Sequence, residues 1–361
     1  MKFQKVKILF ISIIVLLSTV LPATTANALL EQYTTKRIGG QTRFDTAIEV
    51  SKEFVAKAKK PVDSVILCTA YGYADSVSVT PFAVYVNAPI LLTDKEFLTP
   101  STQARIIEMN TKKVYVIGGT GVISDNVLST LSGMGISVER IAGVNRFDTN
   151  RLILAKIPQD LWGANPKFID GYDVFVGLTV TVDTIEQDNT NKINPIILTD
   201  ENGDENDPYS TRSQYYKNIV TTLYNIYGYK FHPFCMSSYG LSTNDKAIET
   251  YGLSFSDKLS ESKLNGDSAS ATNNSLFASK FVSHPYATNS VLITTGLNYI
   301  DAISTGPLAA ITYSPIVYKL PSNNYYYTFS SAYKACYNDV QTVYYIGGSV
   351  VVPDGSESIL K

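Results

Sequence analysis

The sequence is poor in the residues that build catalytic and metal centres. It has two histidines, His232 and His284, which lie far apart in the chain and each stand beside a proline. They cannot supply the histidine-rich zinc site of a wall amidase. We find no Gly-x-Ser-x-Gly nucleophile motif and no paired-acid motif. These absences argue against an enzyme, and the sequence predicts no cofactor.

Cysteine is also scarce. There are three cysteines, an odd number, so a disulfide framework is not expected. Cys68 and Cys235 fall inside apolar strand-like runs, and Cys336 lies in a predicted helix over 332–337. This placement favours buried thiols.

Charge is low for a chain of 361 residues. Charged residues make up 17% of the sequence, and the formal net charge is −2. Such a chain has no global attraction for polyanions, so an anionic partner must be held by local arginines. We therefore predict no nucleic-acid partner.

The sequence has a single long apolar segment, at its beginning. Three lysines precede the apolar run Ile8–Pro22, which is too short to span a bilayer comfortably, and Ala26–Ala28 offers a small-x-small cleavage site. A cleaved export signal over residues 1–28 is predicted, with a retained membrane anchor as the alternative. The mature chain, 29–361, has a formal net charge of −5 and is expected to be soluble, outside the membrane and without a membrane partner.

The sequence repeats itself. The segment Arg37–Thr46 is repeated 103 positions later as Arg140–Thr149, and a degenerate third copy occupies 263–272. Val65–Leu92 aligns without gaps on Val291–Tyr318. One unit used three times leaves no segment for a separate catalytic domain. The predicted divisions are a signal peptide at 1–28, module 1 at 29–134, module 2 at 135–257 with an acidic insertion, and module 3 at 258–361, the last two being degenerate.

Module 1 alternates helical and extended patterns. Continuous apolar strands separated by helices predict a parallel sheet covered on both faces, and therefore an α/β three-layer sandwich. The expected helices are 42–55, 76–86, 100–109 and 124–131, and the expected strands are 65–68, 89–92, 114–117 and 137–141.

Four arginines of the repeated motif are candidate ligand contacts. Arg43 and Arg146 occupy a first helical turn, where the helix dipole disfavours a cation. Their partner is either an acidic residue of a neighbouring module or an anionic ligand, and both alternatives are open. Arg37 and Arg140 precede the same turn, whereas the third copy has Ala269 in place of the second arginine.

Other residues recur at equivalent positions. Thr42 and Asn145 suit helix N-caps and have aspartate three residues on. Asp75, Asp183 and Asp301 recur where the second helix of each module starts, either as N-caps or as ligand contacts. The glycine pair at 118–119 fits a tight strand-to-helix turn better than a phosphate cradle, because the full dinucleotide fingerprint is absent.

Two further features have alternative interpretations. The acidic insertion at 200–207 resembles a calcium loop, but its glycine is misplaced and no glutamate closes it, so a solvated surface loop is favoured. Tyrosine is abundant, with 25 residues, and its rings suit either sugar faces or packing.

Three segments in fixed order carry a resemblance to a known family. They are the Arg-Ile-x-Gly-x-x-Arg-x-x-Thr segment, the Pro-Ile-Leu-Leu strand at 89–92 and the Val-x-Val-Ile-Gly-Gly turn at 114–119. Together they resemble the cell-wall-binding repeat type 2 family of Gram-positive bacteria. The resemblance implies three tandem Toprim-like or flavodoxin-like three-layer modules with parallel sheets, packed around a pseudo-threefold axis. It also implies non-covalent attachment to an anionic secondary polymer of the wall, often beside a separate amidase, protease or surface-layer region.

The prediction is a non-catalytic secreted protein of the cell wall or cell surface. Its partner is an anionic cell-wall glycopolymer, with other surface proteins as a second class. The alternative is a structural or adhesive surface protein, or a modulator of a wall hydrolase, without polymer binding. The Pro-Ile-Leu-Leu strand would mark either the binding edge or a buried central strand. The candidate ligand-binding residues are Arg37, Arg43, Arg140, Arg146, Asp75, Asp301, Leu91 and Leu92.

Overall fold

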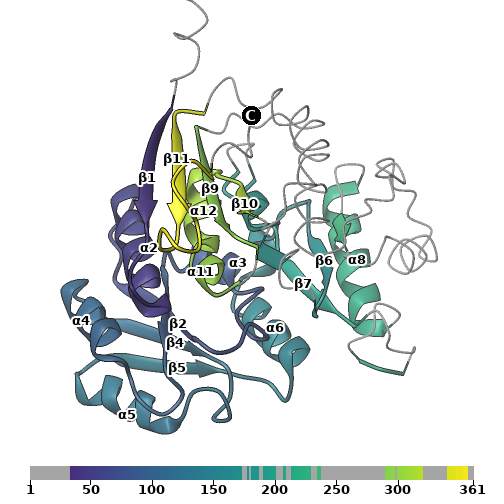
Figure 1. Ribbon diagram of the computed structural model, residues 1–361. Helices are drawn as coiled ribbons and strands as arrows, with labels where there is room; N and C mark the ends of the chain where they lie inside the picture. The colour runs from purple at the N-terminus through teal and green to yellow at the C-terminus, as the bar shows by residue number, and fades with distance from the viewer. Residues whose placement is uncertain are drawn as a thin grey trace, which may run out of the picture.

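Over the residues that the structure describes, the strands form three sheets and pair in parallel (Figure 1). The computed structural model describes residues 33–172, 177–178, 180–186, 190–200, 206–208, 213–228, 234–236, 289–296, 299–319 and 340–356. The first sheet has the strand order β3 (Ile90–Thr93), β2 (Ser64–Thr69), β4 (Lys113–Ile117), β5 (Ser137–Ile141). The second sheet has the order β7 (Ile196–Thr199), β6 (Lys167–Asp170), β8 (Phe234–Met236). The third sheet has the order β1 (Thr34–Ile38), β11 (Thr342–Ile346), β9 (Ser290–Thr295), β10 (Ile316–Lys319).

The helices connect these strands, as the alternating pattern predicts. In module 1, helix α2 starts directly after Thr42, and α5 starts directly after Ser124. The helices are α2 (Arg43–Lys57), α3 (Thr80–Tyr85), α4 (Pro100–Glu108), α5 (Asp125–Gly133), α6 (Arg146–Leu154), α8 (Gln214–Tyr227), α11 (Ile300–Ile303) and α12 (Gly306–Thr312), with short 3₁₀ turns η1 (Gln159–Leu161) and η2 (Val180–Asp183).

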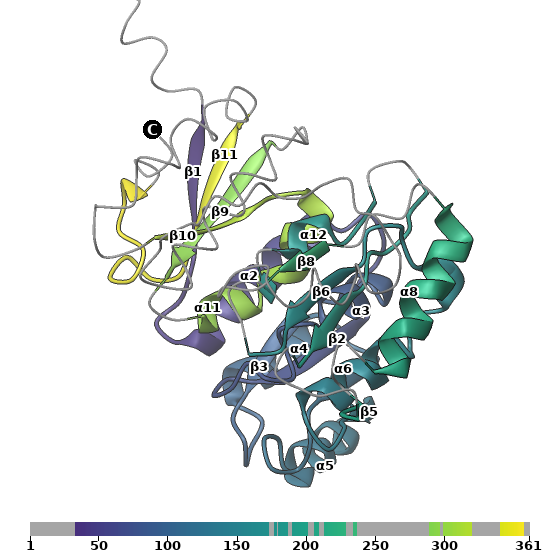
Figure 2. The ribbon, with the colours of Figure 1, turned by 90° about the vertical axis from the view of Figure 1, so that its right-hand side faces the viewer.

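The first sheet is covered on both faces, which confirms the three-layer prediction for this part of the chain. Val65 and Leu67 of β2 share a core with residues of α4 and α5. The intervening Ile66 and Cys68 point the other way and share a core with α3 and α6. Alternation along a strand sends neighbouring side chains to opposite faces, so an unbroken apolar strand needs helices on both. Figure 2 shows α8 flanking β6 in the second module, where its apolar side chains join the same core.

The strands that lead into the two described copies of the motif, β1 and β5, belong to the sheets of other modules. Strand β5 pairs with β4, and β1 pairs with β11 from Thr34 opposite Thr342 to Ile38 opposite Ile346. In Figure 1 the purple β1 and the yellow β11 lie side by side. The buried Glu53 of α2 reinforces this pairing, since it accepts a hydrogen bond of 2.9 Å from Tyr344 Oη. Strand β1 therefore completes the sheet that contains β9, β10 and β11.

Three short helical segments, α3, η2 and α12, meet in the interior. Gly306 at the start of α12 approaches Thr80 and Thr181 so closely that a Cβ there would lie 2.1 Å from Thr80 Oγ1 and 3.3 Å from Thr181 Cγ2. Any larger residue at position 306 would push these segments apart. The close approach fixes how α3, η2 and α12 sit together.

One helix is shorter than predicted. The segment expected to be helical over 76–86 forms α3 only from Thr80, because Pro81 must lie in the first turn of a helix. Within the described ranges no helix is long and apolar enough to cross a membrane. The predicted export signal, the third motif copy at 263–272, the two histidines and the predicted helix at 332–337 lie outside the described residues.

Candidate functional site

The first arginine of the two described motif copies joins two modules. Arg140 on β5 donates from Nη1 to the carbonyl oxygen of Gly118 at 2.7 Å and from Nη2 to Asp125 Oδ1 at 2.9 Å. We call this meeting of the first sheet with the start of α6 the 1/2 junction. Gly118 has a φ of +107°, and a Cβ there would lie 2.9 Å from Asp75 Oδ2. The glycine pair is therefore a tight turn, as predicted, and it packs against Asp75.

The same arrangement recurs where module 3 meets module 1, which we call the 3/1 junction. Arg37 on β1 donates from Nη1 to the carbonyl oxygen of Gly347 at 2.9 Å and from Nη2 to Asp354 Oδ1 at 2.5 Å. The two junctions are built alike. At both junctions the arginine that was predicted to contact a ligand instead contacts another module: Arg140 contacts module 1, and Arg37 contacts module 3.

The helix starts at both junctions are capped. Thr42 and Asp45 form a reciprocal capping box, which confirms that prediction. Asn145 Oδ1 accepts from the backbone N–H of Asp148 at 2.9 Å, but Asp148 Oδ2 accepts from Val144 N at 3.1 Å, one residue earlier than in a capping box. These caps fix the first turns that carry Arg43 and Arg146.

Arg146 lies between two tyrosine rings at the 1/2 junction. Its Nη1 donates to the carbonyl oxygen of Gly171 at 3.0 Å, just after β6. Its guanidinium carbon lies 4.6 Å from the ring centroid of Tyr172 and 5.4 Å from that of Tyr73, which belongs to module 1. Cation–π contact and the hydrogen bond to Gly171 offset the unfavourable helix-dipole position.

Arg43 repeats this geometry at the 3/1 junction. Its Nη1 donates to the carbonyl oxygen of Ala70 at 2.7 Å, just after β2, and its guanidinium lies 5.4 Å from the ring centroid of Tyr71. Each arginine therefore holds the loop that follows the central strand of its own module.

Asp75 connects module 1 to the motif of module 2. Burial raises the pKa of its carboxyl group, while a hydrogen bond with Thr149 and the charge of Arg146 lower it. Thr149 Oγ1 also accepts from Gly143 N at 3.0 Å. The N-cap interpretation of Asp75 is wrong, because Val79 stands at the N-cap of α3.

Asp301 occupies the equivalent place in module 3. Burial raises the pKa of its carboxyl group, and a hydrogen bond with Thr46 and the charge of Arg43 lower it. It lies inside the first turn of α11, whose N-cap is Tyr299, so the N-cap interpretation is wrong here too. An aspartate of one module thus faces the arginine and threonine of the next at both junctions.

Asp183 of module 2 departs from this pattern. Its Oδ2 lies 2.5 Å from Nζ of Lys167, a lysine of its own module that is 1% exposed. The motif that would face Asp183 is the third copy, which has Ala269 in place of the arginine. Asp183 is therefore paired with Lys167 of its own module, whereas Asp75 and Asp301 each face an arginine of another module.

Leu91 and Leu92 lie on β3 and are both 0% exposed. Their side chains belong to the two cores on either face of the first sheet. The structure does not bring them together with the four arginines. Their predicted binding role therefore forms no part of the site described below.

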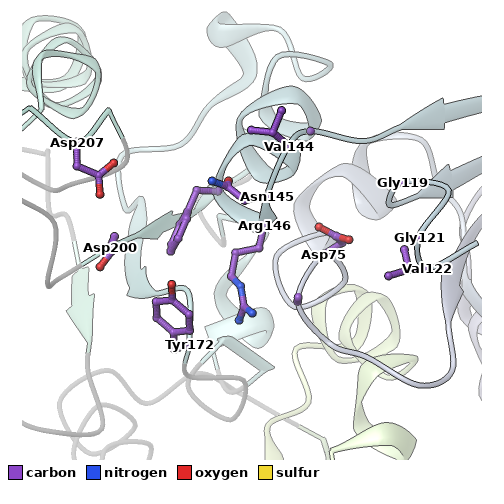
Figure 3. A pocket seen from close by; sticks show the side chains of 13 residues that line it. Asp75, Gly119, Gly121, Val122, Val144, Asn145, Arg146, Tyr172, Asp200 and Asp207 are labelled. Atoms are coloured by element: carbon purple, nitrogen blue, oxygen red, sulfur yellow. The ribbon is translucent and has the colours of Figure 1, made fainter.

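A pocket of about 650 Å³ opens at the 1/2 junction (Figure 3). In this view Arg146 and Tyr172 stand between Asp75 on one side and Asp200 and Asp207 on the other. Among the described residues, no group of three or more His, Cys, Asp or Glu side chains is placed to hold a metal ion. The residues that line the pocket include Asp75, Gly119, Arg146, Tyr172, Asp200 and Asp207.

Sequence reasoning missed several residues of this site. Asp200 and Asp207, expected in a solvated loop, are half-buried and line the pocket. Asp94 follows β3 as Asp200 follows β7, and its hydrogen bond raises the pKa of Tyr71. The available signal was the Thr-Asp pair at the end of β3 (93–94) and of β7 (199–200).

Comparison with known proteins identifies the family. The sequence model of cell wall binding domain 2 matches residues 37–128 and 263–357. From Bacillus subtilis strain 168, the N-acetylmuramoyl-L-alanine amidase LytC is 40% identical over 114 residues, 32% of this chain and 22% of the amidase. An amidase enhancer from the same strain is 35% identical over 113 residues, 31% of this chain and 15% of the enhancer. The chain thus spans well under half of these two relatives.

Two solved structures share the fold. Cwp6 from Clostridium difficile superposes with a TM-score of 0.68 at 24% identity, covering 91% of this chain and 48% of Cwp6. Cwp8 from the same organism gives a TM-score of 0.67 at 21% identity, covering 91% of this chain and 52% of Cwp8. With the family model matching more than half of the sequence, the chain belongs to the cell wall binding domain 2 family.

Proposed function

We propose that this protein is a non-catalytic component of the cell wall that attaches non-covalently to an anionic secondary polymer. Residues 1–28 would direct its export. Its family supports a partner in the wall. The observation that carries the proposal is Arg146, whose guanidinium lines a pocket beside the exposed ring of Tyr172. We also propose that the modules are Toprim-like or flavodoxin-like units related by a pseudo-threefold axis.

The geometry at Arg146 suits an anionic glycan. A guanidinium has five N–H donors, and Arg146 uses one of them on Gly171 within the described part of the chain. The backbone N–H groups at the start of α6 add a partial positive charge. Tyr172 is 52% exposed, so its ring can also pack on a sugar face. Arg146 would contact the acidic group of the polymer, and Tyr172 its sugar.

The junctions predict two binding sites. The 1/2 and 3/1 junctions both have an arginine stacked on a tyrosine and facing an aspartate. In module 2, Asp183 pairs with Lys167, and the third copy of the motif has Ala269 in place of the second arginine. Two weak contacts on one protein molecule reinforce each other through effective concentration. Avid binding therefore does not require a third binding site.

Sedimentation with purified walls tests the proposal. The mature chain, 29–361, is mixed at low ionic strength with walls before and after chemical removal of their secondary polymers. Binding to the intact walls only, with elution by salt, is the expected result, because exposed charge contacts are screened. Equal sedimentation with stripped walls, or none with intact walls, contradicts it.

A second candidate function is modulation of a wall hydrolase without polymer binding. The stretch shared with the amidase enhancer of Bacillus subtilis favours it. It predicts that the chain changes the rate at which a purified wall amidase digests walls stripped of secondary polymer. A zymogram of the chain alone tests for activity of its own, and none is expected.

A further inference from the structure

The turn that follows β4 forms one wall of the pocket at the 1/2 junction, and we call its residues 119–121 the glycine wall. Gly119 and Gly121 line the pocket, and a Cβ on either would lie more than 4 Å from any atom of the described chain. Gly118 needs its positive φ of +107°, but neither of these two glycines has a positive φ. Larger residues would fit at both positions, so their absence leaves space that belongs to the pocket.

The same turn recurs at the 3/1 junction with one difference. In module 1 the backbone N–H of Val122 donates to the carbonyl oxygen of Gly119 at 3.0 Å. The equivalent bond at the 3/1 junction, from Val351 N to the second glycine of its turn, is 3.1 Å. In this register Gly121 corresponds to Val350, whose side chain is 94% exposed. An isopropyl group therefore projects from the 3/1 turn where the glycine wall has only hydrogen.

The polar groups around the glycine wall suit the hydroxyl groups of a sugar. The backbone N–H groups of residues 119–121 donate no hydrogen bond within the described part of the chain. In Figure 3, Asp75 lies between Arg146 and this turn. Its half-buried carboxyl group has a hydrogen bond with Thr149, and a carboxylate has about four acceptor positions. A hydroxyl can accept from the turn and donate to the carboxylate, whereas an anion can only accept.

We propose that Gly121 is a specificity-determining residue. It lets a hydroxyl-bearing sugar unit of the wall polymer lie against the glycine wall, while the acid of a neighbouring unit contacts Arg146. This rests on the proposed wall-polymer function and deepens it. The pocket, at about 650 Å³, is in the size range of sites that enclose small-molecule ligands. Val350 blocks the equivalent position, so the 3/1 junction keeps its arginine contact without a place for this sugar.

Exchanging the two residues tests the proposal on purified walls that retain their secondary polymers. Gly121→Val should weaken binding of the mature chain about tenfold, because the side chain fills the space and displaces the hydrogen-bonded sugar. Its melting temperature should be unchanged or higher, since a side chain fits there and glycine is the more flexible residue. Gly121→Ala should show a smaller loss of binding. The control is Gly133→Val, at a glycine with equally open surroundings outside the pocket, and it should bind as the wild type does.

Val350→Gly makes the reciprocal change and should bind at least as tightly as the wild type, because it opens the second position. Undiminished binding by folded Gly121→Val overturns the proposal and leaves the proposed function standing. Weaker binding by Val350→Gly also overturns it, because the valine would then contact the polymer. If the wild type does not bind the walls, the proposed function fails, and this proposal with it.

Discussion

Removing the guanidinium of Arg140 should destabilise the junction between modules 1 and 2. The Arg140 side chain is 18% exposed and donates to Gly118 O and to Asp125, which is 76% exposed. A hydrogen bond from a charged donor to the carbonyl of a buried residue is worth roughly 1.5–3 kcal/mol, whereas the exposed ion pair adds less than about 1 kcal/mol. Arg140→Ala should therefore lower the free energy of unfolding by about 2–3 kcal/mol.

The matched control removes only the exposed partner. Asp125→Asn should cost about 1 kcal/mol or less, from the ion pair and the lost charge in the first turn of α5. Urea titration followed by fluorescence of the buried Trp162 measures both variants. If Arg140→Ala leaves the unfolding midpoint unchanged but weakens wall binding, Arg140 is a ligand contact and the structural reasoning is refuted.

Three other predictions concern buried polar groups. Lys167→Met removes the ammonium from the 13%-exposed Asp183 and should lower the free energy of unfolding by roughly 3–5 kcal/mol, measured by urea titration, without loss of wall binding by the folded fraction. Because burial raises the native pKa of Asp75 above its unfolded value, the native state holds this proton to higher pH, and the group's contribution to stability falls as pH rises through the native pKa. Asp75→Asn should accordingly raise the melting temperature at pH 7 and change it little near about pH 3, and a lower melting temperature at pH 7 would refute this reasoning. Tyr344→Phe removes a hydrogen bond to the buried Glu53 and should cost about 1–2 kcal/mol in urea titration, whereas an unchanged midpoint would mean that this contact does not hold β1 to β11.

The local elements were predictable because their causes are local. The apolar runs gave β2 and β4, and the cap at Thr42 gave the start of α2. Pro81 is likewise a local signal, because it requires the second helix to start close to it. These features depend on residues a few positions apart, which a single sequence displays directly.

The site was less predictable because it is assembled from different modules. Periodicity cannot reveal that β1 completes the sheet of β11, or that Asp75 meets Thr149. The repeat did indicate that Arg146 needs a distant partner, and the structure supplies a carbonyl, two rings and a nearby carboxyl group.

The most direct test of the account is the affinity of the mature chain for purified walls after neutral replacement of the stacked arginines. Arg43→Gln and Arg146→Gln should each weaken binding about tenfold or more, and the double variant should lose it, as each site loses a charge-assisted contact. The control is Arg151→Gln, the same change on the helix of Arg146, α6. Arg151 does not line the pocket, so this variant should bind as the wild type does. Undiminished wall binding by a folded double variant would contradict the claim that the junction arginines hold the polymer.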